Sequence, residues 1–194
     1  MAIREHALLY AFICRSILDN HSKEEAEELI KKITVSYGHK RGERMRSNSD
    51  TGDLTDFFIN GEWKGKEGEN ISTLWTEDGK TVSEVKKCAW YDTWKDNGLL
   101  EYGTYYCRYI DRSICDGYGS SFSLDVRKTK GQGDDECLFV WDESYDQKRL
   151  EESERKHILD FDFHCKELLD TAMEIIEDEN IKKEIAQIYE GLSQ

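Results

Sequence analysis

The chain has 194 residues, of which 41 are acidic and 27 are basic, and its formal charge at pH 7 is −14. A chain of this length is typical of one domain with a hydrophobic core of ordinary size. The acidic surplus argues against binding to nucleic acid or to anionic membranes, because both interactions need a surplus of lysine and arginine to meet phosphate groups. No segment reaches the roughly 18 consecutive apolar residues that predict a membrane span.

The N-terminus and the cysteines indicate the cellular compartment. The first 20 residues have a helical apolar period and an acidic residue at Glu5, and no small-residue cleavage site follows them, so they do not resemble a signal peptide. Six cysteines in a chain without an export signal are expected to be free thiols in a reducing compartment. We therefore expect a cytoplasmic protein. Whether it forms a homo-oligomer is left open by the sequence.

Apolar spacing predicts helices at both ends of the chain. Residues 3–18 form one helix, and a second helix begins at Ser22, which makes a capping box with the glutamate three positions later. We expect this second helix to end or bend near Gly38. From residue 147 the chain is predicted to be helical to its end, with a break near residue 179.

Two β-hairpins and three shorter helices are predicted for the middle of the chain. Asp78-Gly79, which suits the positive φ angles of a type I′ turn, separates two strand-like runs in residues 71–88. A second hairpin joins residues 122–126 to residues 137–141. An Asp53 cap and glycines at 98 and 117 delimit the helices 54–58, 90–97 and 99–116. The expected fold class is α+β, with a small antiparallel sheet of two hairpins packed on N-terminal and C-terminal helices in a single domain, residues 1–194.

Residues 39–46, HKRGERMR, form a basic cluster in this acidic chain. Arg41 and Arg44 are three positions apart and share one face of a helix, and Arg46 is a weaker third candidate. Charge runs of this kind commonly form a solvated face. The functional alternative is an anion site, since a guanidinium pairs with a carboxylate through two parallel hydrogen bonds.

The stretch from Cys88 to Asp142 concentrates residues that can carry chemistry, including four of the six cysteines and three of the five tryptophans. Cys107, Asp111 and Cys115 fall at i, i+4 and i+8 of the predicted helix and look out on nearly one face, so that thiols and a carboxylate lie together. Cys137 alternates with apolar residues on its strand and is expected to point toward the core or a pocket. Further along, His164 lies on an apolar helical stripe, where a histidine is either a hydrogen-bonded core residue or a base or metal ligand.

Four segments follow one another in the order RGERMR, CAWYDTW, EYGTYYCRYID and GDDECLFVW. In this order and spacing they resemble the L-2-amino-thiazoline-4-carboxylic acid hydrolase family over residues 36–142, with weaker support around His164. Ala89 departs from the family's pattern, which has proline between the cysteine and the tryptophan. The resemblance implies a hydrolase that acts on cyclic C–N or C–S amidine bonds. It would open a thiazoline carboxylate to a carbamoyl-cysteine on the way to cysteine, so the expected partner is a small-molecule carboxylate.

Such a reaction needs an anchor for the carboxylate, a base for the attacking water and stabilisation of the tetrahedral centre. The candidate substrate-binding residues are the arginines of the basic cluster and three aromatic residues that would enclose the ring: Arg41, Arg44, Arg46, Trp90, Trp94 and Tyr106. The candidate catalytic residues are a thiol, a carboxylate and an imidazole: Cys107, Asp111 and His164. Asp111 would act as the base or hold a cationic amidine, and Cys107 would act as a nucleophile.

Three alternatives stay open at the level of the sequence. A zinc site with an open position for water would use thiolates and an imidazole, although no C-x-x-C spacing supports it: Cys88, Cys107, Cys137 and His164. No other cofactor is indicated. A non-catalytic small-molecule sensor of the vinyl-reductase-like type would share the late C-x-F strand. A helical interaction protein would dock through its acidic C-terminal helix and leave the cysteines and aromatic residues unexplained.

Overall fold

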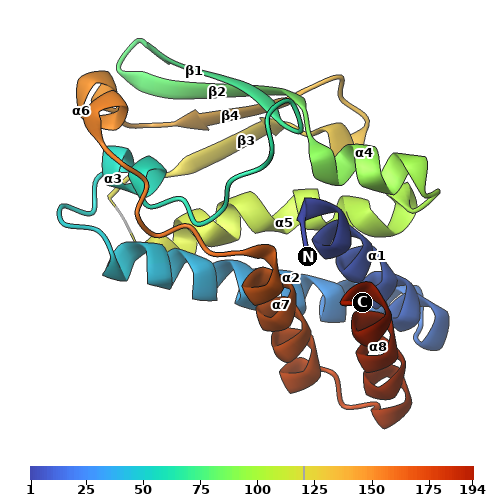
Figure 1. Ribbon diagram of the computed structural model, residues 1–194. Coiled ribbons are helices and arrows are strands. Elements are labelled where there is room, and N and C mark those ends of the chain that lie inside the picture. The colour runs from blue at the N-terminus through green and yellow to red at the C-terminus, as the bar shows by residue number, and fades with distance from the viewer. Residues whose placement is uncertain (120) are drawn as a thin grey trace.

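A computed structural model describes residues 1–119 and 121–194 (Figure 1). The α+β class predicted from the sequence is confirmed, since the described residues combine helices with one small antiparallel sheet. The elements are α1 Ile3–Asn20, α2 Lys23–Ser47, α3 Leu54–Ile59, β1 Ile71–Glu77, β2 Lys80–Lys87, α4 Ala89–Asp96, α5 Leu100–Tyr118, β3 Leu124–Lys128, a 3₁₀ turn at Lys130–Gln132, β4 Cys137–Trp141, α6 Gln147–Glu152, α7 Phe161–Ile175 and α8 Glu179–Leu192. No described helix has both the length and the apolar character that crossing a membrane would require.

Both predicted hairpins are confirmed, and they join into one sheet with the strand order β1-β2-β4-β3. The turn between β1 and β2 has positive φ angles at Asp78 (49°) and Gly79 (73°), as the type I′ geometry requires. The two hairpins meet where β2 pairs with β4, with Val82 opposite Val140. All neighbouring strands are antiparallel.

The longer helices α1, α2, α5, α7 and α8 lie on one side of this sheet. Figure 1 shows the sheet over α5, α2 on the other side of α5, and α7 and α8 farther from the sheet. A large hydrophobic cluster joins α1, α2, α5, α7 and α8, and a smaller one joins the sheet to the C-terminal ends of α2 and α5. The region between the sheet and the two central helices is thus bordered by both clusters.

The predicted end or bend near Gly38 is wrong, because α2 continues unbroken to Ser47. A Cβ on Gly38 would lie 2.5 Å from the Cβ of Ser113, and one on Gly42 would lie 2.2 Å from the carbonyl oxygen of Ile114. These glycines therefore allow α2 and α5 to approach closely. Burial of the two packed faces outweighs the roughly 1 kcal/mol that glycine costs in a helix.

The helix that was expected to stop at Gly117 is also longer than predicted. A Cβ on Gly117 would lie 2.6 Å from the Cα of His39, so this glycine too serves the contact between α2 and α5. The left-handed residue that ends α5 is Gly119, with φ 63°, which is the conformation that glycine adopts most easily at this position.

The C-terminal region is not one helix from residue 147, because residues 153–160 separate α6 from α7. This extended segment runs beside the loop before β1. The N–H of Leu159 donates to the carbonyl oxygen of Glu62 at 2.7 Å, and Arg155 donates from Nη2 to the carbonyl oxygens of Gly61 and Trp63. Contacts with a distant part of the chain therefore replace the helical hydrogen bonds here.

Candidate active site

A cavity of about 490 Å³ lies between the sheet and the helices α2 and α5. The start of α4, α3 and the loop before β1 complete its walls. Alternate residues of β4, Cys137, Phe139 and Trp141, belong to the lining, which confirms the prediction that Cys137 points toward the core or a pocket. A cavity of this size is typical of small-molecule sites, which measure about 300–1,000 Å³.

Arg41 of α2 lines this cavity and is held from three sides. Its Nε lies 3.4 Å from Oε2 of Glu62, its Nη1 lies 3.4 Å from the hydroxyl of Tyr106, and its guanidinium lies 5.6 Å from the ring centre of Tyr37. These contacts engage two of the five N–H donors of a guanidinium. With 5% of its surface exposed, Arg41 is a buried cation beside the cavity.

The other two arginines of the basic cluster lie elsewhere. Arg44 donates from Nη2 to Glu62 at 3.0 Å and to Glu167 at 2.9 Å, so two carboxylates surround its guanidinium. Arg46 donates to the carbonyl oxygen of Ser49 at 3.4 Å and is exposed. Neither belongs to the described cavity lining. Of the three predicted anchors, the fold brings Arg41 to the cavity.

Asp111 of α5 is a half-buried carboxylate that lines the cavity. Burial raises its pKa to about 6, although the charge of Arg41 lowers it. Among the described residues, no side chain donates a hydrogen bond to this carboxylate. A carboxyl group with a pKa near 6 is ionised in most molecules at pH 7 and can still accept a proton during a reaction.

Three thiols line the same cavity: Cys88 at the N-cap of α4, Cys107 on α5 and Cys137 on β4. Burial raises the pKa of each of them, to about 12 for Cys137. The negative charge of Asp111 raises the pKa of Cys107 further. These thiols stay protonated near neutral pH, and a protonated thiol is a weak nucleophile.

The proposed zinc ligands do not come together as a set. Within the described residues, no three side chains of histidine, cysteine, aspartate or glutamate are arranged to hold a metal ion. His164 does not belong to the described lining, and Cys115, one turn after Asp111, is buried in the smaller hydrophobic cluster. The residues present therefore do not fit the zinc arrangement.

His164 of α7 has a structural hydrogen bond. Its Nε2 lies 3.3 Å from the carbonyl oxygen of Glu62, and its buried Nδ1 has no partner in the described part of the chain. Burial and then the charge of Arg41 lower its pKa to about 3. A histidine with this pKa is neutral at pH 7 and is a weak base.

Two of the three predicted aromatic walls line the cavity. The rings of Trp90 and Tyr106 are stacked at 12°, with centroids 6.4 Å apart. The indole N–H of Trp90 donates a hydrogen bond to Nδ1 of the buried His6 at 3.0 Å, which fixes the orientation of the ring. Trp94 is completely buried instead, and its indole N–H donates to the carbonyl oxygen of Ala7. It supports the helix packing and does not line the cavity.

Two further cations of the lining had no signal in the sequence. Lys64 lies in the loop before β1, and Arg155 lies in the extended segment after α6. A single basic residue in a segment without periodicity looks like ordinary solvated charge. With Arg41 they place three basic residues and one acidic residue, Asp111, in the described lining, although the chain as a whole is strongly acidic.

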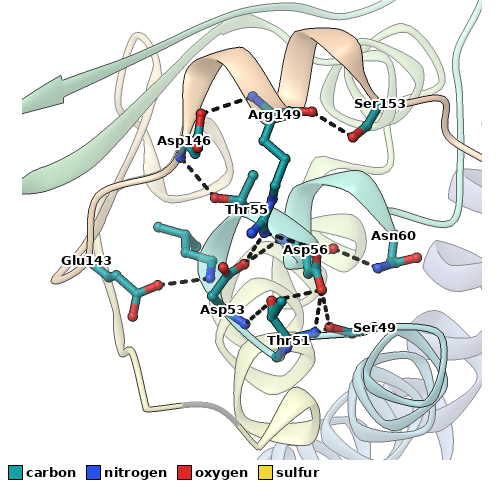
Figure 2. Close-up of polar contacts among 12 residues, drawn as sticks. Ser49, Thr51, Asp53, Thr55, Asp56, Asn60, Glu143, Asp146, Arg149 and Ser153 are labelled. Carbon is teal, nitrogen blue, oxygen red and sulfur yellow. Dashed lines mark hydrogen bonds and ion pairs between the residues drawn. The ribbon is translucent and has the colours of Figure 1, made fainter.

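The short helix α3 also contributes to the wall, and a polar network fixes it (Figure 2). Its predicted cap is confirmed, since Asp53 accepts a hydrogen bond from the N–H of Asp56 at 2.9 Å. The carboxylate of Asp56 accepts from the N–H of Thr51 at 2.8 Å and from the hydroxyl of Ser49 at 2.9 Å. A helix of six residues is too short to be stable alone, so these bonds determine its position.

Arg149 of α6 connects this network to the C-terminal region. It lies between Asp53 and Asp56 and pairs with both carboxylates (Figure 2). Burial opposes ionisation of Asp56, but the hydrogen bonds and the charge of Arg149 lower its pKa overall. The network thereby positions Phe57 and Phe58, which line the cavity.

One known family matches the sequence of this chain. The sequence model of the L-2-amino-thiazoline-4-carboxylic acid hydrolase family matches residues 1–141. No curated protein and no solved structure matches the chain significantly. The matched part extends from α1 through β4 and contains Arg41 and Asp111, whereas Arg155 and His164 lie beyond it. Since well over half of the residues match, the chain belongs to the L-2-amino-thiazoline-4-carboxylic acid hydrolase family.

Proposed function

We propose that the protein hydrolyses a cyclic amidine that carries a carboxylate, and that it opens a ring of the 2-amino-thiazoline-4-carboxylate type to a carbamoyl-cysteine. Family membership supports the hydrolase class. The observation that carries the proposal is the presence of Arg41 and Asp111 in one cavity that is enclosed by aromatic residues. This pair supplies a carboxylate anchor and a base for water.

Arg41 is the proposed anchor. A buried guanidinium whose contacts leave several N–H groups can bind a carboxylate through two parallel hydrogen bonds. The surplus of basic residues in the lining favours an anionic ligand, and in a chain with a formal charge of −14 this surplus is not a result of composition. Lys64 and Arg155 would add attraction toward the cavity.

Asp111 is the proposed general base. It takes a proton from water as the water oxygen bonds to the ring carbon between nitrogen and sulfur. As the carbonyl forms, the ring nitrogen takes up the hydroxyl proton of the tetrahedral centre. The ring bond to sulfur or to nitrogen breaks, and the leaving atom receives the proton from Asp111. The net reaction adds one water molecule and consumes nothing else. The pKa near 6 suits both transfers close to neutral pH.

Tyr106 and Cys107 take supporting roles in this proposal. The Tyr106 hydroxyl accepts a hydrogen bond from Arg41, and burial raises its pKa, so its own proton remains a donor for the tetrahedral centre. The raised pKa of Cys107 argues against the nucleophilic role considered from the sequence. We assign Cys107 to the wall of the cavity.

The test is turnover of 2-amino-thiazoline-4-carboxylate by the full chain, followed by mass spectrometry of the carbamoyl-cysteine product. We expect Asp111→Asn to lower kcat by about 10²–10⁴, whereas Cys107→Ala, which removes the competing thiol, should retain most activity. An equal loss of kcat in both variants would indicate that Cys107 takes part in the reaction. Binding of this compound without any turnover would refute the enzyme proposal and favour the small-molecule sensor.

A further inference from the structure

We propose that the natural substrate carries an apolar group of about the size of a phenyl ring in addition to the carboxylate and the heterocycle. This inference rests on the proposed function, which assigns the carboxylate and the ring to Arg41 and Asp111. It concerns the other end of the same cavity, which we call the apolar end and define by six residues: Met45, Phe57, Phe58, Leu124, Phe139 and Trp141.

The size of the cavity is the first argument. The compound that gives the family its name has about nine non-hydrogen atoms, and at the roughly 30 Å³ that a water molecule occupies in the liquid these would fill about half of the cavity. The cavity measures about 490 Å³. Enzymes position reacting groups through contacts on several sides, so a substrate that leaves half of the cavity unfilled would be positioned poorly.

The second argument is how the two ends are arranged along the helices. Met45 follows Arg41 by one helical turn on α2, and Ile114 follows Asp111 by nearly one turn on α5. All four residues line the cavity. One turn advances about 5.4 Å, so a ligand anchored at the charged pair and extended toward the C-terminal ends of both helices would enter the apolar end.

The chemistry of this end is the third argument. Its aromatic rings form a continuous wall, in which Phe58 lies edge-on to Trp141 at 5.1 Å between centroids and Phe139 lies 6.2 Å from Trp141. Phe57, Phe58 and Phe139 each retain accessible surface, while they belong to the lining. Apolar surface that faces a cavity gains from contact with an apolar ligand group.

The experiment measures binding, so that it does not depend on turnover. Isothermal titration calorimetry of the wild-type chain would compare thiazole-4-carboxylate, which is aromatic and resists hydrolysis, with its 2-phenyl and 5-phenyl derivatives. We expect the better phenyl derivative to bind about tenfold to a hundredfold more tightly than the parent compound, because burying a ring of this size is worth that ratio. If neither derivative binds at least threefold more tightly than the parent compound, the inference is wrong.

A pair of variants tests where in the cavity the phenyl group binds. Phe58→Ala should remove most of the phenyl advantage and leave the affinity for the parent compound nearly unchanged. Trp75→Ala is the control, because Trp75 is an exposed aromatic residue on β1 outside the described lining. A phenyl advantage that survives Phe58→Ala unchanged would refute the assignment to the apolar end. Failure of the proposed function would appear separately, as absence of turnover with 2-amino-thiazoline-4-carboxylate and also with its 5-phenyl derivative.

Discussion

Replacing Asp111 with asparagine should make the folded protein more stable at neutral and alkaline pH while it abolishes activity. Burial raises the pKa of this carboxyl from its ordinary value of 3.8 to about 6. A carboxyl whose pKa is raised on folding contributes stability below its unfolded pKa and loses that contribution as the pH rises through its folded pKa. Above pH 6 the ionised side chain therefore destabilises the folded state.

The size of the effect follows from the two pKa values. The difference between 3.8 and about 6 corresponds to about 3 kcal/mol when the carboxyl is ionised in both states. The side chain is only half-buried and faces the cavity, so solvent reduces this figure, and we expect about 1–3 kcal/mol at pH 8. Asparagine has nearly the same shape without the charge, so Asp111→Asn should recover this amount.

Urea unfolding at pH 4, 6 and 8 measures this effect. At pH 8 the midpoint of the variant should lie above that of the wild type by about 0.3–1.5 M for a slope near 2–3 kcal/mol per molar urea. Near pH 4 the difference should be small. Asp125→Asn is the control, because Asp125 is an exposed residue of β3 whose replacement should change stability by less than about 0.5 kcal/mol. A variant less stable than the wild type at pH 8, or a difference that does not vary with pH, would refute the reasoning.

Three further predictions concern the pH profile, the helix contact and the α3 network. The kcat/KM of the wild type should rise with pH through about 6 and level off above it, since the base form of Asp111 is the active one; a profile that falls over this range would contradict the assigned role. Gly42→Ala should destabilise the fold by about 2 kcal/mol in urea unfolding, because its Cβ would meet the backbone of α5 at 2.2 Å. Gly191→Ala is the control, because no atom lies within 4 Å of the Cβ that it would add to α8, and it should raise the stability of the fold by about 0.5–1 kcal/mol. Equal effects of the two substitutions would contradict the packing argument. Arg149→Ala should cost about 1 kcal/mol at pH 7, and the cost should shrink as the pH falls through the lowered pKa of Asp56 and this carboxylate takes up a proton. A cost that does not fall on acidification would exclude the ion pairs as its source.

The local features of this fold were predictable because short-range chemistry decides them. A serine or aspartate that accepts a backbone N–H begins a helix wherever it is followed by helical apolar spacing, as at Ser22 and Asp53. The Asp78-Gly79 turn and the alternation in β4 likewise depend on residues that are neighbours in sequence. Helical and strand periods predicted that Cys107 and Asp111 share a face and that Cys137 points inward, but Cys115 has the same helical period and is buried in the smaller hydrophobic cluster, so packing decided which of these residues line the cavity.

The features decided only by the tertiary structure involve residues far apart in the sequence. Gly38 looked like a helix end because a glycine has the same local propensity whether or not another helix packs against it, and only the approach of Ser113 shows the difference. Arg41 and Arg44 were equivalent as members of a helical face. Glu62 contacts both of them, but Arg44 also pairs with Glu167, and Arg41 is the one that lines the cavity.

The cavity as a whole likewise depends on contacts between residues that are far apart in the sequence. The pairing of β2 with β4 and the extended segment that carries Arg155 form through contacts between distant residues. The raised pKa of Asp111 depends on burial, which exists only after the sheet covers α5. The sequence by itself determined which elements form and which side chains share a face, whereas the packing of those elements determined which charges face the cavity and how strongly they are desolvated.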